Sequence, residues 1–234
     1  MKTVHLGQCN STQEYLKIHL DNLQLEDKSV LVSTDLQLSG KGRSGNFWHS
    51  YEGSLAFSFC INPSEVLTLS SLEIGVLISH FFEDKYRKII QLKWPNDLMT
   101  EEGKCGGILI QNIQDQLIVG IGLNLFQLEE EKRHDEYPHS FLFQHNIFSE
   151  DYKKILPEKI YQYILDNRMN PDRIIEEWNK LCIHQNQLVS FENGDELSHG
   201  FFLGIGKSGE ALIDENGVTR SIYSGSLRPI STPQ

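Results

Sequence analysis

The spacing of apolar and polar residues predicts an α+β chain built in two parts. Up to about residue 184, apolar runs typical of buried strands alternate with segments of helical period. The predicted strands of this part cover residues 29–34, 54–61, 89–93, 105–112 and 115–125. After Gln187, short alternating runs separated by turns such as Asn193-Gly194 and Asn216-Gly217 predict a small all-β module. We therefore expect one domain over residues 1–184 and an SH3-like β domain over residues 185–234.

Helical spacing predicts four helices. The first begins in Ser11-Thr12-Gln13-Glu14, which has the spacing of a capping box. The second is predicted from Asn62-Pro63-Ser64-Glu65, where an Asn cap precedes Pro at the first helical position, and it runs to about Phe82. Its apolar residues lie nearly all round, so we expect it to be buried. The last two helices should cover about 150–167 and 171–183.

Composition and charge narrow the class of protein. The chain has 234 residues and a formal net charge of -11, which argues against a general nucleic-acid binder. It has no secretory h-region and no run of eighteen apolar residues, so we expect a cytoplasmic protein without a membrane span. The four cysteines are widely spaced and form no Cys-x-x-Cys pair, which disfavours a zinc site or a disulfide framework. Residues 129–136 form a charge run that is most simply a solvated loop.

A basic glycine-rich segment, residues 37–48, follows the first predicted strand. Its glycines at alternate positions allow the backbone to curl round an anion with exposed N–H groups. Lys41 and Arg43 supply two cations that we expect to be unpaired, and Trp48 could form an aromatic wall. From the pattern alone, a flexible surface loop is an equal alternative.

A second candidate cluster lies in the segment from Lys93 to Gly107, which reads KWPNDLMTEEGKCGG. A strand is predicted to end at Lys93, and Asn96 and Asp97 follow in a turn. If residue 93 and residues 104–110 lie on adjacent strands of a hairpin, Lys93, Asp97 and Lys104 converge on one pocket, where a carboxylate can partner a buried lysine. A charged hairpin on the surface is the alternative.

Other glycine-rich strings fail as nucleotide motifs. Gly204-Ile205-Gly206-Lys207-Ser208 lacks the first glycine of a P-loop, and Gly120-Ile121-Gly122 lacks the third glycine of a dinucleotide fingerprint. Both are interpreted as close-packed strand or turn glycines. Neither an HExxH nor a Gly-x-Ser-x-Gly motif is present, which leaves metalloprotease and serine-hydrolase functions without support.

In this order, the motifs resemble those of the biotin–protein ligase family in its short form, without an N-terminal DNA-binding domain. The resemblance spans essentially the whole chain, and Lys93-Trp94-Pro95-Asn96-Asp97 is its most specific part. The other matching segments are Ser11-Thr12-Gln13, Gly40-Lys41-Gly42-Arg43-Ser44-Gly45, Gly103-Lys104-Cys105-Gly106-Gly107, Gly120-Ile121-Gly122-Leu123-Asn124 and Ser226-Leu227-Arg228. It implies a catalytic domain like class II aminoacyl-tRNA synthetases, with a mixed sheet and helices, followed by a small SH3-like barrel.

The resemblance also implies an activity. Such an enzyme forms biotinyl-5′-AMP from biotin and ATP, with Mg²⁺ accompanying the ATP and no protein-bound metal. It then transfers biotin to a lysine of a biotin carboxyl carrier domain of a carboxylase. The catalytic residues implied are Arg43, Lys104, Lys93 and Asp97. The biotin-binding residues implied are Ser11, Thr12, Gln13, Gln37, Lys41, Gly42, Arg43, Lys104, Gly106 and Gly107. The ATP-binding residues implied are Lys41, Arg43, Trp48, Asn96, Asp97 and Asn124.

Two departures from the family pattern stand out. Lys41 and Gln13 occupy positions where the family usually has Arg and Asn, and Lys keeps the charge of Arg but loses its bidentate fork.

Three alternatives stay open: a lipoate- or octanoyl-protein ligase, an inactive biotin-binding regulator, and an interaction module built on the β domain. Because Met1 lies only ten residues before Ser11, we expect no helix-turn-helix domain and no DNA partner. A homodimer is left open.

Overall fold

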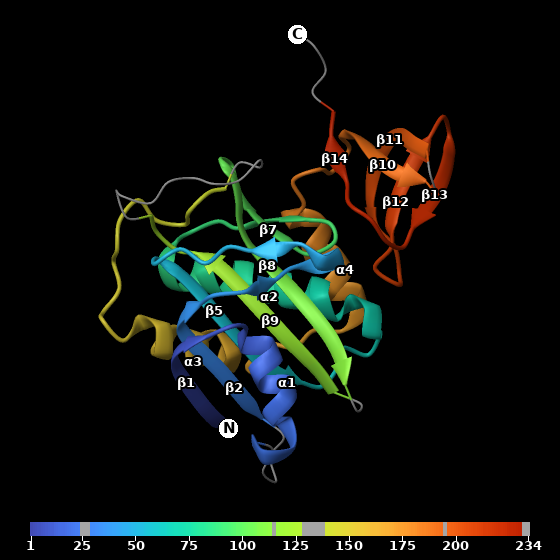
Figure 1. Ribbon diagram of the computed structural model, residues 1–234. Helices are drawn as coiled ribbons and strands as arrows, with labels where there is room; N and C mark the ends of the chain where they lie inside the picture. Colours follow the sequence, from blue (N-terminus) through green and yellow to red (C-terminus); the bar gives the residue numbers. More distant parts are fainter. Residues whose placement is uncertain (24–28, 114–115, 128–138, 194–195, 231–234) are drawn as a thin grey trace.

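The computed structural model describes residues 1–23, 29–113, 116–127, 139–193 and 196–230. Figure 1 shows a large sheet flanked by helices and, beside it, a small separate β module that contains the C-terminal part of the chain. The expected α+β class is therefore confirmed. Within the described residues, every helix is too short or too polar to cross a lipid bilayer.

The large sheet has seven strands in the order β1-β2-β5-β9-β8-β7-β6. Its strands are β1 (Lys2–Cys9), β2 (Val30–Gln37), β5 (Ser54–Ile61), β6 (Gln91–Lys93), β7 (Asp97–Thr100), β8 (Gly103–Ile113) and β9 (Gln116–Asn124). β1 and β2 are parallel and every other neighbouring pair is antiparallel, so the sheet is mixed. The central strands β5 and β9 are apolar because both of their faces are covered.

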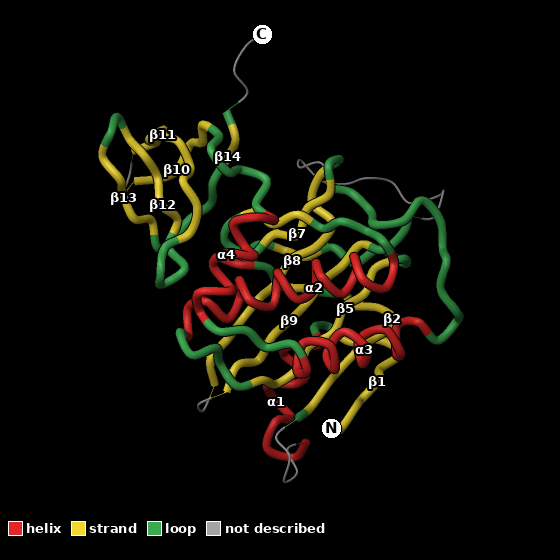
Figure 2. Tube along the Cα trace, turned by 180° about the vertical axis from the view of Figure 1, so that it is seen from behind, coloured by secondary structure: helices red, strands yellow, loops and turns green. Residues whose placement is uncertain are grey.

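Helices cover both faces of this sheet. Behind it lie α2 (Ser70–Tyr86), α3 (Tyr152–Asp166) and α4 (Pro171–Leu181), which Figure 2 shows across the sheet. In front lies α1 (Thr12–Leu23), whose Leu16 and Leu20 pack with Val32, Cys60 and Ile118 in a cluster of their own. α1 covers only one end of the front face (Figure 1).

The predicted start of the second helix was wrong. Residues 62–66 are extended or bent, a short 3₁₀ turn covers Leu67–Leu69, and α2 begins only at Ser70. Tertiary contacts override the local helix-start pattern, because the backbone N–H of Ser64 donates to Ser70 Oγ and Ser64 Oγ donates to the buried carboxylate of Glu73. The expectation that this helix is buried is confirmed, with Val76 and Phe82 fully inaccessible.

The edge strand β1 was not predicted. Lys2–Cys9 reads KTVHLGQC and is half-exposed along most of its length, so it lacks the apolar run by which the inner strands were recognised. It pairs in parallel with β2 from Lys2↔Val30 to Cys9↔Gln37. This pairing brings the start of α1 beside the end of β2, which matters for the site.

The C-terminal module is a five-stranded antiparallel sheet in the order β13-β12-β11-β10-β14. Its strands are β10 (Leu188–Asn193), β11 (Glu196–Ile205), β12 (Ala211–Glu215), β13 (Val218–Ile222) and β14 (Arg228–Pro229). As predicted, Asn216-Gly217 forms a hairpin turn, with φ of 56° and 83°. The turn predicted at Asn193-Gly194 and the charge run 129–136 lie outside the described residues. The domain boundary at 184/185 falls between α4 and β10 and stays a prediction.

The module is packed against the large domain. The Trp178 and Phe202 rings meet edge to face with centroids 6.2 Å apart. Buried residues of both parts belong to one continuous apolar core. The module therefore packs beside the turn that joins β6 and β7.

Candidate functional site

The basic segment lies on the front face of the sheet, where it forms a small hairpin of β3 (Gly40–Lys41) and β4 (Phe47–Trp48) joined by a 3₁₀ turn at Arg43–Gly45 (Figure 1). The segment is thus ordered rather than a bare surface loop. Gly40 is required at its base, since a Cβ there would lie 2.5 Å from both Gln37 Nε2 and the Trp48 carbonyl.

The Trp48 indole lies directly on β9. A Cβ on Gly122 would come within 2.4 Å of Trp48 Cε2, so only glycine allows the ring to lie there. A Cβ on Gly107 of the neighbouring strand would lie 3.7 Å from the same ring. Gly120, Gly122 and Gly107 therefore form a flat floor at the front face. The interpretation of Gly120 and Gly122 as close-packed strand glycines is confirmed, and Gly204 to Ser208 form the end of β11 and a turn.

At one end of this floor lies a polar cluster in which Thr12 and Ser58 are buried and Gln37 is partly buried. The backbone N–H and the hydroxyl of Thr12 both donate to Gln37 Oε1, at 3.0 and 3.4 Å. Thr12 Oγ1 also lies 2.8 Å from Ser58 Oγ on β5. Because its oxygen is already used by Thr12, the Gln37 side chain has its NH₂ group left to donate to a ligand.

Ser11 and Gln13 lie beside this cluster in different roles. Ser11 accepts from the backbone N–H of Glu14 at 3.4 Å, so it caps α1 as the capping box predicted. Gln13 Nε2 donates to the carbonyls of Leu109 and Ile118, at 3.1 and 3.2 Å. The Gln13 amide is therefore anchored to the sheet, and both side chains are buried against it.

At the other end of the floor, two lysines converge on one carboxylate. Lys104 Nζ lies 2.5 Å from Asp97 Oδ1, and Lys93 Nζ lies 3.7 Å from Asp97 Oδ2. Lys104 Nζ also stands 5.9 Å from the Trp48 ring centroid. The predicted convergence of these three groups is confirmed. The predicted hairpin was wrong in detail, because β7 lies between β6 and β8 and the two flanking strands do not pair.

Arg43 reaches this cluster from the hairpin above it. Its Nη1 donates to Asn96 Oδ1 at 3.4 Å, while Asn96 Nδ2 donates to the Ile108 carbonyl at 2.7 Å. Burial lowers the pKa of Arg43 below its ordinary value. The nearby Asp97 carboxylate raises the pKa and offsets only part of this shift. The guanidinium is half-buried, so a phosphate or acyl phosphate reaching it would meet a cation that water screens only in part.

Lys41 departs from its prediction as an unpaired cation. Its Nζ lies 3.2 Å from Glu14 Oε1 on the first turn of α1. Both side chains remain partly exposed, so the pair is a surface one that an anionic ligand can compete with. The basic segment alone does not indicate this pair, because Glu14 lies outside it.

Asn124 ends β9 on the same front face. It is 1% exposed, and its Oδ1 accepts from Ser54 Oγ at 3.0 Å. It is therefore a buried strand residue and not a solvent-facing turn residue. Sequence reasoning missed Ser54 and Ser58, although both interrupt the apolar run SLAFSFCI at positions four residues apart, which places them on one face of β5.

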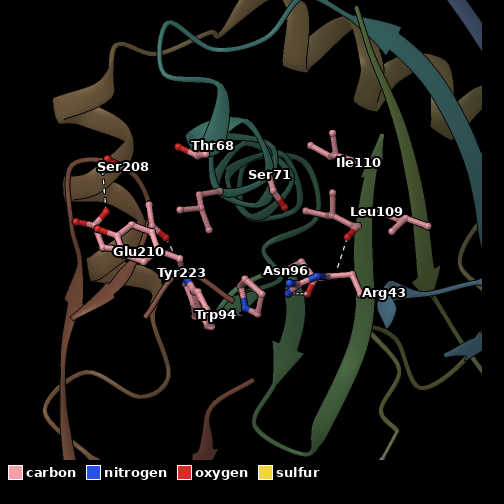
Figure 3. A pocket seen from close by; sticks show the side chains of 14 residues that line it. Arg43, Thr68, Ser71, Trp94, Asn96, Leu109, Ile110, Ser208, Glu210 and Tyr223 are labelled. Carbon is pink, nitrogen blue, oxygen red and sulfur yellow. Dashed lines mark hydrogen bonds between the residues drawn. The ribbon is translucent and has the colours of Figure 1, made fainter. Parts of the chain in front are cut away.

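A cleft of about 320 Å³ opens behind Arg43, between the start of α2, the β6–β7 turn and the C-terminal module. Figure 3 shows Arg43 and Asn96 at one end of this cleft and Glu210 and Tyr223 of the module at the other. Trp94 lies between them, and its Nε1 donates to the Gly209 carbonyl at 3.0 Å. The module thus forms one wall of a cleft that leads to the cations.

Comparisons with known proteins show the family of this chain. Residues 6–124 match the biotin/lipoate A/B protein ligase family. The bifunctional ligase/repressor BirA of Escherichia coli is 24% identical over 231 residues, covering 93% of this chain and 71% of BirA. Biotin–protein ligase 2 of Arabidopsis thaliana is 34% identical over 109 residues, covering 42% of this chain and 33% of that protein. The structure of the biotin protein ligase of Aquifex aeolicus in complex with biotin and ATP superposes with a TM-score of 0.80 at 28% identity, covering 98% of this chain and 99% of that one. The chain belongs to the biotin/lipoate A/B protein ligase family.

Proposed function

We propose that this protein is a biotin–[biotin carboxyl-carrier protein] ligase. It joins biotin to ATP, with Mg²⁺ bound to the nucleotide as part of the substrate, and passes the biotinyl group to a lysine of a carrier domain. The observation that carries the proposal is the pairing of a partly buried polar cluster at Thr12 and Gln37 with a cation cluster at Arg43 and Lys104. The two clusters lie at opposite ends of one glycine floor.

The polar cluster suits the ureido head of biotin. The NH₂ group of Gln37 and the hydroxyl of Thr12 can donate to a ureido carbonyl in a partly buried site. The valeryl chain would then run from this cluster toward Lys104, beside the Trp48 ring that lies on Gly122. Biotin's carboxylate would arrive beside Lys104 and Arg43, where its charge is neutralised.

In the first step, a biotin carboxylate oxygen attacks the α-phosphorus of ATP and the bond to the β-phosphate oxygen breaks. Pyrophosphate leaves and biotinyl-5′-AMP remains. Two anions meet in this step, so fixed cations at the reacting oxygens lower its barrier. Lys104 and Arg43 supply them, while Asp97 and Asn96 orient the two side chains.

In the second step, the carrier lysine's amine attacks the acyl carbon and AMP leaves with the bonding electrons. An amide bond replaces the mixed anhydride, and the ammonium proton is lost to solvent or a base. The cations that accept the carboxylate charge in the first step also stabilise the departing phosphate. Trp48 and Asn124 are proposed to hold the adenine of ATP. Lys41 and Gly42 are proposed to hold the mixed anhydride of biotinyl-5′-AMP.

The same polar cluster argues against lipoate or octanoate as the substrate. An acyl group with an apolar head would leave the NH₂ group of Gln37 without an acceptor and the Thr12 hydroxyl with only its long 3.4 Å bond to Gln37 Oε1. Unpaired buried donors cost roughly 1–3 kcal/mol each, so the site discriminates against such a ligand. Arg43 and Lys104 are both present, which argues against a catalytically inactive regulator.

The proposal is tested by pyrophosphate release from ATP on addition of biotin, followed by labelling of a purified biotin carboxyl carrier domain. We expect release to depend on biotin and not on lipoate or octanoate added at the same concentration. A carrier domain whose acceptor lysine is replaced by arginine is the matched control and should stay unlabelled. Release that depends on lipoate and not on biotin would contradict the proposal.

A further inference from the structure

We propose that Ser58 is a positioning residue for ligand recognition, which acts by fixing the direction of the Thr12 hydroxyl. This inference rests on the proposed function, since the ligand group concerned is the ureido carbonyl of biotin. Ser58 lies in the middle of β5, opposite Val32 on one side and Gly120 on the other. It is fully inaccessible to solvent, so it cannot itself touch a ligand.

The direction of the hydrogen bonds follows from counting protons. A serine hydroxyl has one proton to donate. Among the described residues, the side-chain partner of Ser58 is Thr12 Oγ1, at 2.8 Å. If Thr12 donated to Ser58, the Ser58 proton would have no acceptor, and a buried donor without a partner is costly. Ser58 therefore donates to Thr12.

This direction leaves the Thr12 proton pointing away from the sheet. Without a ligand it donates to Gln37 Oε1 over a long 3.4 Å, while the backbone N–H of Thr12 already serves that oxygen at 3.0 Å. The hydroxyl proton is therefore the one that a better acceptor can capture. Because Ser58 occupies a lone pair of Thr12 Oγ1, the hydroxyl is held as a donor toward the ligand.

Among the described residues, Thr12 and Gln37 thus present only donors to the ligand. Thr12 offers its hydroxyl proton and Gln37 its NH₂ group, whose oxygen is fixed by the Thr12 backbone. A carbonyl oxygen accepts from both groups. A ligand that carries an N–H in place of that oxygen would confront two donors. Discrimination by such unpaired buried groups is stronger than discrimination by shape. Ser58 determines this selectivity through Thr12.

The test compares Ser58→Ala with the wild type in calorimetric binding of biotin and of 2-iminobiotin, which has an N–H group where biotin has the ureido oxygen. We expect Ser58→Ala to weaken biotin binding about tenfold, as expected for one lost hydrogen bond in a polar site. The KM for ATP should stay within about twofold. The ratio of biotin to 2-iminobiotin affinity should fall, because the freed Thr12 hydroxyl can turn to accept.

Ser79→Ala is the matched control. Ser79 is a buried serine on α2, and its hydroxyl donates to the Ile90 carbonyl at 2.6 Å behind the sheet. Its removal should cost similar stability and leave the ratio unchanged. In a Thr12→Val background, Ser58→Ala should weaken biotin no further, because Ser58 acts through Thr12.

Three results would overturn the inference: an unchanged affinity ratio in Ser58→Ala, an equal change in Ser79→Ala, or full additivity with Thr12→Val. Failure of the proposed function would give a different result, because the wild type itself would then bind no biotin.

Discussion

Trp94 of the KWPND segment donates its indole N–H to the backbone carbonyl of Gly209, 115 residues further along the chain. Gly209 has a φ of 79°, and a Cβ there would lie 3.0 Å from Leu72 on α2. A turn of the C-terminal module is thus seated between α2 and the β6–β7 turn. That β6–β7 turn carries Asn96 under Arg43 and leads into Asp97 between its lysines. The module therefore braces the cation cluster from behind.

The brace predicts a specific defect for Trp94→Phe. The phenyl ring keeps most of the packing but loses the N–H bond to Gly209. Unfolding free energy should fall by about 1 kcal/mol, and the KM for ATP should rise several-fold as the turn loosens. Urea denaturation and pyrophosphate-release kinetics measure the two effects. Trp178→Phe, in the same interface but away from the turn, should lose stability while keeping the KM for ATP.

Lys104→Gln should abolish most of the adenylation rate. The ammonium group at 2.5 Å from Asp97 is the cation nearest the proposed carboxylate end. We expect a loss of about 10²–10³ in kcat for biotin-dependent pyrophosphate release, the usual effect of removing one group aimed at developing charge. Lys159→Gln, on the exposed face of α3, is the control and should leave kcat unchanged. A loss below about fivefold in Lys104→Gln would count against a catalytic role.

Lys41→Arg should retain the adenylate better than the wild type. Lys41 holds Glu14 at 3.2 Å as a point charge, whereas arginine can bond a carboxylate or phosphate through two N–H groups. We expect release of biotinyl-5′-AMP, followed in a filter-binding chase, to slow several-fold. Glu14→Gln tests the Lys41–Glu14 pair separately in the same assay. Equal release rates for Lys41→Arg and wild type would disprove the hypothesis that lysine weakens retention.

Glu73→Gln should destabilise the fold without touching the site. Its buried carboxylate accepts from Ser64 Oγ, Arg168 Nε and the backbone N–H of Met169, at 2.6, 2.9 and 2.8 Å. Removing one charge of a buried pair typically costs about 3 kcal/mol. Thermal and urea unfolding should show this loss, with the KM values for both substrates intact at low temperature. Glu83→Gln, exposed on the same helix, should change stability by less than about 0.5 kcal/mol.

His184 should make stability depend on pH. Burial, followed by the charge of Lys93, lowers the pKa of His184 to about 4. Because the folded pKa lies below the unfolded value of about 6.5, the unfolded chain binds the proton first as the pH falls. Stability from the neutral ring is complete above pH 6.5 and is lost progressively toward pH 4.

The measurement is the free energy of unfolding in urea at several pH values between 7 and 4. The wild type should lose up to about 3 kcal/mol of unfolding free energy between pH 7 and pH 4 because of His184, and His184→Gln should not show this loss. His145→Gln, at an exposed position, should leave the slope as in wild type. An identical slope in His184→Gln and wild type would show that the buried imidazole does not titrate with unfolding.

The sequence by itself was sufficient for the elements whose signal is local. The inner strands at 29–34, 54–61 and 115–125 follow from apolar runs, and the last two helices and the Asn216-Gly217 hairpin follow from period and turn chemistry. The motif order further predicted the family and the residues that gather at the front face. These inferences succeeded because burial on both faces, or a required backbone angle, restricts residue type at each position.

Tertiary structure decided what depends on residues distant in the chain. The Glu73 cluster moved the start of α2 to Ser70, β7 came between β6 and β8, and Glu14 paired with Lys41. The roles of Ser58 and of the Gly209 carbonyl could not be assigned from the sequence. A single hydroxyl or backbone oxygen leaves no sequence pattern, and its role depends on a partner that only the folded structure brings near. Hydrogen bonds and ion pairs act over about 3 Å in space. The partners Trp94 and Gly209, for example, lie 115 residues apart in the chain.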